Sequence, residues 1–291
     1  MALYADIVTE WQKKNILTAA DLATALNGHA ISFAYHSGKI ENDNITYHDT
    51  REIFDHDGVT SYTGDLKTLF EIRNSKDAYE LLLSDFEKHL PITEDLIKRF
   101  HVEITKNTYD TYRWQKGERP GQYKIGDYIT GKNEVGLYPD EVPEAIQDLL
   151  SEIQNISSKN VLVAAAYFHA SFENIHPFAD GNGRTGRLLL NYFLITHNHP
   201  PLVIYQEDRT RYFDALEAWD TQEELNPLID FLTQEVEKTW GPRIQCQQRP
   251  SLSETLSRME SQFQEAQQQA EQHNRDQSHN KDDNSTIENT R

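Results

Sequence analysis

The feature that most constrains this sequence is a glycine-rich segment, residues 176–187, lying between two strongly apolar helical patterns. It reads His-Pro-Phe-Ala-Asp-Gly-Asn-Gly-Arg-Thr-Gly-Arg. Before it, apolar residues recur at the spacing of one buried helix face. After it, residues 188–195 are apolar almost all round, which is typical of a core helix. The pattern predicts two packed helices joined by a polar loop.

Helical periodicity extends over most of the chain and predicts an all-α fold. We expect one or two helices in 3–27 and single helices at 28–41, 65–90, 141–155, 208–220 and 225–240. Thr18 or Asp21, Thr46 and Thr93 are candidate N-caps. We expect N-terminal helices over residues 1–43, a main domain over 44–244 and a polar tail over 245–291, with 276–291 disordered.

Residues 119–139 break the helical pattern. Pro120 and Gly121 precede a run of aromatic and β-branched residues, and a second short run follows Gly131. This composition predicts one β-hairpin, although a glycine-rich loop without strands would look similar.

Composition limits the classes of function. The 291 residues carry a formal net charge of −19, whereas nucleic-acid binding normally needs a basic face. The single cysteine allows no intrachain disulfide. No apolar run reaches the length of a membrane span, and the N-terminus lacks a signal pattern. We therefore expect a cytoplasmic protein that binds neither nucleic acid nor a membrane.

The start of the second apolar helix has the chemistry of an anion site. A helix beginning at Gly183 would present unpaired N–H groups, and Gly181 and Asn182 would let the backbone approach a phosphate closely. Arg184 and Arg187 are three residues apart, so they share a helix face, and their guanidinium groups match phosphate oxygens.

Two further side chains in the segment suit group transfer. Asp180 is a hard oxygen ligand for a Mg²⁺ ion that is shared with substrate phosphates. His176 can accept a proton near neutral pH. The structural alternative is a glycine-rich turn in which Asp180 and Asn182 act only as caps. His101 and His169 lie in helices beside apolar residues and are expected to be structural.

The segment closely resembles the signature of the Fic family. Every specified position of that signature is matched: His176, Phe178, Asp180, Gly181, Asn182, Gly183, Arg184 and Arg187. The resemblance extends over roughly residues 30–240. It implies a helical Fic domain with a hairpin flap, and an enzyme that uses ATP and Mg²⁺ to attach AMP to a Tyr, Thr or Ser hydroxyl of a target protein, releasing pyrophosphate.

The resemblance also implies roles for individual residues. His176 would be the general base and Asp180 the metal ligand, while Gly181, Asn182 and Gly183 would hold the α- and β-phosphates. Arg184 and Arg187 would clamp the β- and γ-phosphates. Tyr212 would line the nucleotide pocket, with a packing role as the alternative.

The flap would bind the target segment by strand addition. Its residues would be Tyr123, Lys124, Ile125 and Tyr128, and Lys124 stands where family flaps often carry Arg. Self-modification on a tyrosine and a homodimer are further expectations.

Residues 37–42 resemble the inhibitory pattern of a Fic subgroup, in which Ser37, Glu41 and Asn42 occupy the specified positions. Glu41 would pair with Arg187 and deprive the γ-phosphate of its clamp. Displacing this helix would cost on the order of a few kcal/mol. An exposed acidic helix end is the alternative reading.

Other functions remain open. The same site could transfer UMP, phosphate or phosphocholine, or it could remove AMP hydrolytically with Glu41 orienting water. A non-catalytic interaction module on a Fic-like scaffold is the alternative from a different class.

Overall fold

The computed structural model describes residues 3–60, 62–128, 136–154, 160–247, 253, 255–267 and 269. Contacts divide the chain into two units, Met1–Pro242 and Arg243–Arg291. In the second unit, the described residues between 253 and 269 are helical, and the predicted disordered segment 276–291 lies outside the described residues.

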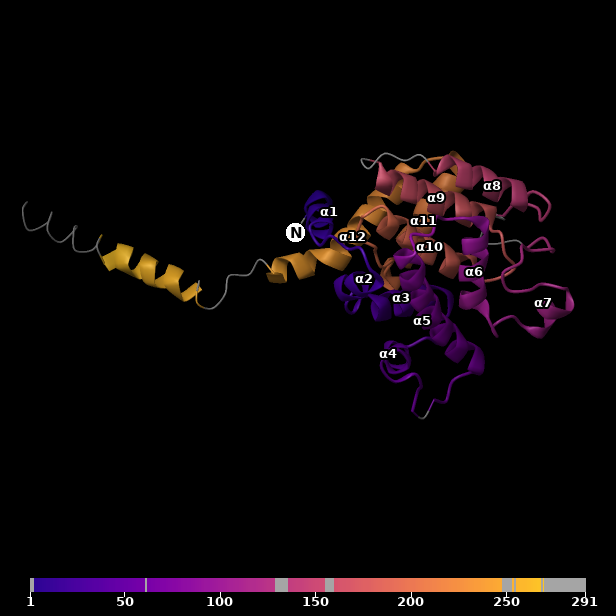
Figure 1. Cartoon of the computed structure of the whole chain (residues 1–291), viewed down its shortest axis with the longest axis horizontal. Helices are drawn as coiled ribbons and strands as arrows, with labels where there is room; N and C mark the ends of the chain where they lie inside the picture. Colours follow the sequence, from indigo (N-terminus) through magenta and orange to yellow (C-terminus); the bar gives the residue numbers. More distant parts are fainter. Residues whose placement is uncertain are drawn as a thin grey trace, which may run out of the picture. The chain divides into compact units, whose positions relative to one another are not determined.

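The first unit is built from helices (Figure 1). They are α1 (Tyr4–Gln12), α2 (Ala19–Ala25), α3 (His29–Glu41), α4 (Tyr47–His56), α5 (Leu66–Glu87), α6 (Glu94–Thr105), α7 (Thr111–Gln115), α8 (Val142–Glu152), α9 (Val161–Ile175), α10 (Asn182–Thr196), the 3-10 helix η1 (Gln206–Asp208), α11 (Arg209–Gln222) and α12 (Asn226–Gln247), whose last turn belongs to the second unit. None of the described helices is long and apolar enough to cross a membrane. The predicted all-α fold is confirmed.

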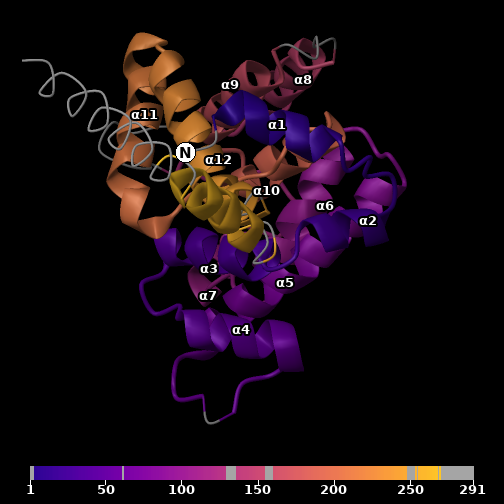
Figure 2. The same cartoon turned by 90° about the vertical axis from the view of Figure 1, so that its left-hand side faces the viewer.

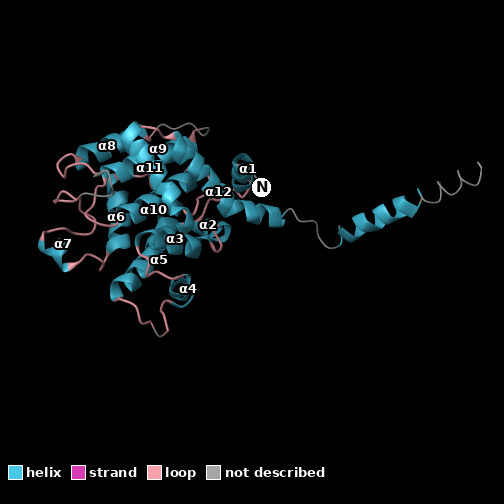
Figure 3. Ribbon diagram, turned by 180° about the vertical axis from the view of Figure 1, so that it is seen from behind, coloured by secondary structure: helices cyan, strands magenta, loops and turns pink. Residues whose placement is uncertain are grey.

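The predicted hairpin is not confirmed. Residues 119–128 and 136–139 form turns, bends and extended loop without a strand (Figure 3), and 129–135 lie outside the described residues. One physical reason is Glu118, whose buried carboxylate accepts hydrogen bonds from the backbone N–H groups of Ile125 and Gly126 at 3.0 and 2.9 Å. A side chain thus takes two backbone donors that a partner strand would otherwise pair.

Local capping signals explain where several helices begin. The Thr18 hydroxyl accepts a hydrogen bond from the Asp21 N–H, and the Asp21 carboxylate accepts one from the Thr18 N–H, forming a capping box. Thr46 and Thr93 cap α4 and α6 in the same way, each accepting a bond from the third residue of its helix. The predicted N-caps Thr18, Thr46 and Thr93 are therefore confirmed.

Helix α10 is the central element of the core. Except for Gly183 and Thr196, every residue of α10 is buried. Helices α9, α6, α3 and α5 all pack against it, and Figure 2 shows it enclosed among them. The first turn of this helix carries the polar end of the sequence signature, so a helix packed on several sides positions those side chains.

A core substitution in α10 tests this arrangement. Leu189 is fully buried, so Leu189→Ala should lower the free energy of unfolding by about 2–5 kcal/mol through lost burial and a cavity. Leu66→Ala is the matched control, because Leu66 is 69% exposed at the start of α5. Urea unfolding of both variants makes the measurement, and an equal loss in the two would contradict the central position of α10.

Candidate active site

The segment 176–181 joins α9 to α10 through two residues in the left-handed region. His176 ends α9 with φ 49° and Gly181 caps α10 with φ 82°. A Cβ atom on Gly181 would lie 2.4 Å from Cγ2 of Thr105, so only glycine fits there. The Asn182 side chain closes the loop, because its Oδ1 accepts from the Phe178 N–H at 2.9 Å and its Nδ2 donates to the Phe178 carbonyl at 2.7 Å.

His101 on α6 connects this loop to the segment predicted as a flap. Its Nε2 lies 2.8 Å from the Asp180 carbonyl oxygen, and its Nδ1 accepts from the Gly121 N–H at 2.8 Å. These partners assign the neutral ring with the proton on Nε2. The ring also stacks on Phe178 with centroids 3.7 Å apart. The sequence gives no local sign of this link, because its three partners come from two distant segments.

His176 is held by backbone bonds on both sides. The Lys124 N–H donates to the Pro177 carbonyl at 2.9 Å, and the Leu137 N–H donates to the Ile175 carbonyl at 3.2 Å. Burial, reinforced by the nearby Lys124 charge, lowers the pKa of His176 to about 4. The imidazole is therefore neutral at physiological pH and can accept a proton.

Arg187 is buried and bound to α3. Its Nε donates to the Ser37 hydroxyl at 2.9 Å, and its Nη2 donates to the Ser37 carbonyl at 2.9 Å and to Glu41 Oε1 at 2.7 Å. The side chain of Arg187 is 2% exposed but that of Glu41 is 37% exposed, so this ion pair is screened on one side. Burial opposes ionisation of Glu41, yet the charge and hydrogen bond of Arg187 outweigh it and lower the pKa of the carboxyl.

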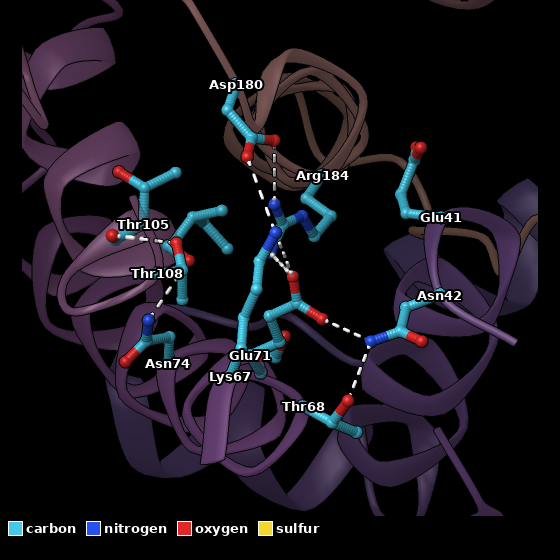
Figure 4. Close-up of polar contacts among 12 residues, drawn as sticks. Glu41, Asn42, Lys67, Thr68, Glu71, Asn74, Thr105, Thr108, Asp180 and Arg184 are labelled. Carbon is cyan, nitrogen blue, oxygen red and sulfur yellow. Dashed lines mark hydrogen bonds and ion pairs between the residues drawn. The ribbon is translucent and has the colours of Figure 1, made fainter. Parts of the chain in front are cut away.

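Arg184 is held by two other carboxylates. Its Nη2 donates to Asp180 Oδ1 at 3.3 Å, and its Nη1 lies 3.4 Å from Glu71 Oε1 (Figure 4). The second Asp180 oxygen faces Lys67 at 3.9 Å and Arg113 at 4.0 Å. Asp180 thus stands among three cationic side chains, which is an environment suited to anionic ligands.

Glu71 also contacts the end of α3. Its Oε2 accepts from Asn42 Nδ2 at 2.7 Å, and the same nitrogen donates to the Thr68 hydroxyl at 2.9 Å (Figure 4). The structure therefore brings Ser37 and Glu41 to Arg187, and connects Asn42 through Glu71 to Arg184. Periodicity gave no reason to select Glu71, because it reads as an ordinary helical glutamate.

The described residues limit how a metal could bind. Within them, no group of three or more His, Cys, Asp or Glu side chains could hold a metal ion. Asp180 provides one carboxylate, of which one oxygen accepts from Arg184 and the other has cations no closer than 3.9 Å. This donor set fits a Mg²⁺ ion whose other ligands are substrate phosphate oxygens and water.

Tyr212, expected in the nucleotide pocket or in packing, lies in the interior. It is 1% exposed, packs against Phe213 and Phe231, and its hydroxyl lies 2.8 Å from His169 Nε2. Burial, with the Arg187 charge, lowers the pKa of His169 to about 3. On the same side of α10, burial raises the pKa of Glu173 to about 8.

The His101 link predicts a pH-dependent stability. Burial lowers the pKa of His101 from 6.5 to about 4, so below pH 6.5 the unfolded chain binds a proton that the folded chain does not. The stabilisation is present above pH 6.5 and is lost as the pH falls towards 4. Between pH 7 and 5, His101→Gln should reduce the loss of unfolding free energy by about 2 kcal/mol. Urea unfolding at both pH values measures it, and an unchanged difference would refute the assignment.

Comparison with known proteins identifies the domain. Residues 91–194 match the family model described as Fic/DOC family. The chain is 28% identical over 231 residues to a protein named Protein adenylyltransferase Fic from Drosophila persimilis, covering 77% of this chain and 43% of that protein. The protein of the same name from Drosophila grimshawi is 27% identical over 259 residues, covering 84% and 51%. The chain thus spans about half the length of these curated relatives.

Solved structures share the fold. A Fic domain containing signaling protein from Bacteroides thetaiotaomicron superposes with a TM-score of 0.68 at 23% identity, covering 81% of this chain and 92% of that one. A fragment of Fic-1 from C. elegans gives a TM-score of 0.68 at 22% identity, covering 82% and 70%. Residues 91–194, which include α6–α10 and the signature loop, thus match the Fic/DOC family, and the solved structures share the fold that surrounds them.

Proposed function

We propose that this protein is an adenylyltransferase that moves AMP from ATP to a Tyr, Thr or Ser hydroxyl of a target protein, and that Glu41 inhibits it in cis. One observation carries the proposal: a neutral His176 stands beside the N-terminus of α10, whose first two turns hold the buried Arg184 and Arg187. That arrangement combines a base with a polyphosphate clamp. The names of the curated relatives support AMP as the transferred group.

In the proposed reaction, the target hydroxyl oxygen attacks the α-phosphorus of ATP. His176 takes the hydroxyl proton as the new P–O bond forms, and the bond from the α-phosphorus to the pyrophosphate oxygen breaks. The N–H groups at the start of α10 bind phosphate oxygens, and Arg184 and Arg187 neutralise the pyrophosphate charge. Mg²⁺, held by Asp180 and the phosphates, would supply further charge neutralisation.

The flap residues Tyr123, Lys124, Ile125 and Tyr128 would receive the target segment. The segments 123–128 and 136–138 are fixed to the chain on both sides of His176 by the bonds to Pro177 and Ile175. A peptide that pairs with either segment would place its hydroxyl near the base. This part of the proposal does not require regular strands in the free protein.

Inhibition follows from competition for the arginines. The Arg187 guanidinium already donates three hydrogen bonds to α3, two to Ser37 and one to Glu41. A γ-phosphate must replace the Glu41 carboxylate before Arg187 can clamp it. Because Glu41 is 37% exposed, its share of the barrier is smaller than that of a fully buried pair.

Labelling with ATP carrying the isotope at the α-phosphate tests the function. With Mg²⁺ and a cell lysate, Glu41→Gly should label target bands about tenfold or more faster than the parent, because Arg187 is released. His176→Ala in the Glu41→Gly background should abolish labelling. A labelled band at this protein's own mass would report self-modification.

Equal labelling in parent and Glu41→Gly would contradict the inhibition, and labelling independent of His176 would contradict the transferase. Labelled UTP and ATP labelled at the γ-phosphate test UMP and phosphate transfer.

The second connection of α3 predicts a weaker release. Asn42→Ala removes the bonds to Glu71 and Thr68, together with the bond that its Oδ1 accepts from the Asn44 N–H, but leaves Glu41 in place. We expect labelling between that of the parent and that of Glu41→Gly, a rise of about 2- to 5-fold for the loss of one or two hydrogen bonds. Asn44→Ala, at an exposed position next to the helix end, is the control and should label as the parent does. No rise in Asn42→Ala would show that α3 is held by Ser37 and Glu41 alone.

A further inference from the structure

Lys124 is a buried cation for which the fold provides no partner among the described residues. The residue is 2% exposed, and its Nζ has no hydrogen-bond partner in the part of the chain that the structure describes. Among the described residues, Lys124 forms no ion pair, so no carboxylate oxygen lies within 4.0 Å of its Nζ. An ammonium group in this position destabilises the folded chain, because it has left water without gaining an equivalent interaction.

Two carboxylates act on the Lys124 charge from a distance, but they do not offset the cost of burying it. Asp127 and Glu118 favour the charged lysine, but burial dominates and lowers the pKa of Lys124. Glu118 is committed elsewhere, because its Oε1 accepts the backbone N–H groups of Ile125 and Gly126. A lysine buried at such a site therefore points to a bound ligand as its partner rather than to a role in the fold.

The ammonium group lies beside the proposed base. A Cβ atom built on Gly136 would be 3.1 Å from Lys124 Nζ and 3.4 Å from the Cβ atom of His176. The Lys124 N–H is bonded to the carbonyl of Pro177, the residue after His176. In agreement with this proximity, the Lys124 charge is the largest contribution after burial to the lowered pKa of His176.

We propose that Lys124 binds a non-bridging oxygen of the α-phosphate of the nucleotide, as a basic side chain that acts in addition to Arg184 and Arg187. The assignment rests on the proposed function, in which His176 deprotonates the hydroxyl that attacks this phosphorus. The α-phosphate must then lie next to His176, within reach of the ammonium group. The two arginines are assigned to the distal phosphates, so Lys124 would supply a side-chain cation at the phosphorus that reacts.

Binding of AMP and adenosine isolates this contact, because the two ligands differ by the α-phosphate alone. Lys124→Met should weaken AMP binding by about 10- to 100-fold, the range for a hydrogen bond to a charged group, and should leave adenosine binding unchanged. Lys124→Arg should keep most of the preference for AMP. Lys116→Met is the matched control, because it removes an exposed lysine and changes the net charge equally. Calorimetric titration of the full chain gives the AMP and adenosine affinities of the parent and of each variant without relying on catalysis.

Thermal unfolding of the free protein provides the second measurement. Removing an unpartnered buried charge and keeping the unbranched side chain should raise the melting temperature of Lys124→Met by about 2–4 °C for each kcal/mol gained. AMP should raise the melting temperature of the parent more than that of the variant. A lower melting temperature for free Lys124→Met, or equal loss of AMP and adenosine binding, would assign a structural role and overturn the proposal. Unchanged AMP affinity would overturn it even if transferase activity is present.

Discussion

The resting site depends on the neutralisation of Arg187, a guanidinium buried at the second turn of the central core helix. A charge in that position destabilises the fold unless it is paired and hydrogen-bonded. Helix α3 supplies the hydrogen-bond acceptors and the negative charge through Ser37 and Glu41, which precede Arg187 by about 150 residues in the sequence. Helix α3 is therefore part of the candidate active site, and it packs directly on α10.

The charge of Arg184 is neutralised by a different pair of carboxylates. Its partners, Asp180 and Glu71, come from the signature loop and from α5, and Glu71 also receives the Asn42 amide at the end of α3. Both arginines of the signature thus face carboxylates, and both sets of contacts reach the last turn of α3. In the proposed function a polyphosphate replaces these interactions, so nucleotide binding and the position of α3 are thermodynamically linked.

Local signals in the sequence predicted most of the helices and selected the signature loop as the candidate site, because caps, apolar periodicity and loop composition act over a few residues. Thr18, Thr46 and Thr93 mark helix starts for that reason. The sequence did not indicate that the Glu118 carboxylate would bind the flap backbone in place of a partner strand. A single side chain in that role leaves no periodic pattern in the sequence. His101 was expected to be structural, but its partners in the loop and the flap were not foreseen, and Glu71 was missed, because these contacts are brought together only by the fold. The short helix α7 was missed because five residues carry too little periodicity.

The absence of a side chain on Gly183 leaves space at the start of α10 that the Glu41 carboxylate occupies. The Glu41 Oε1 atom lies 2.4 Å from where a Cβ atom of Gly183 would be. The carboxylate therefore lies against the bare backbone at the start of α10, where the proposed function requires phosphate oxygens to bind. In this view Glu41 is an internal ligand tethered to the protein, and its occupancy depends on an effective concentration set by the rigidity of α3. In the proposed function, a partner or a second copy that moved α3 by a small amount would alter nucleotide affinity without contacting the nucleotide.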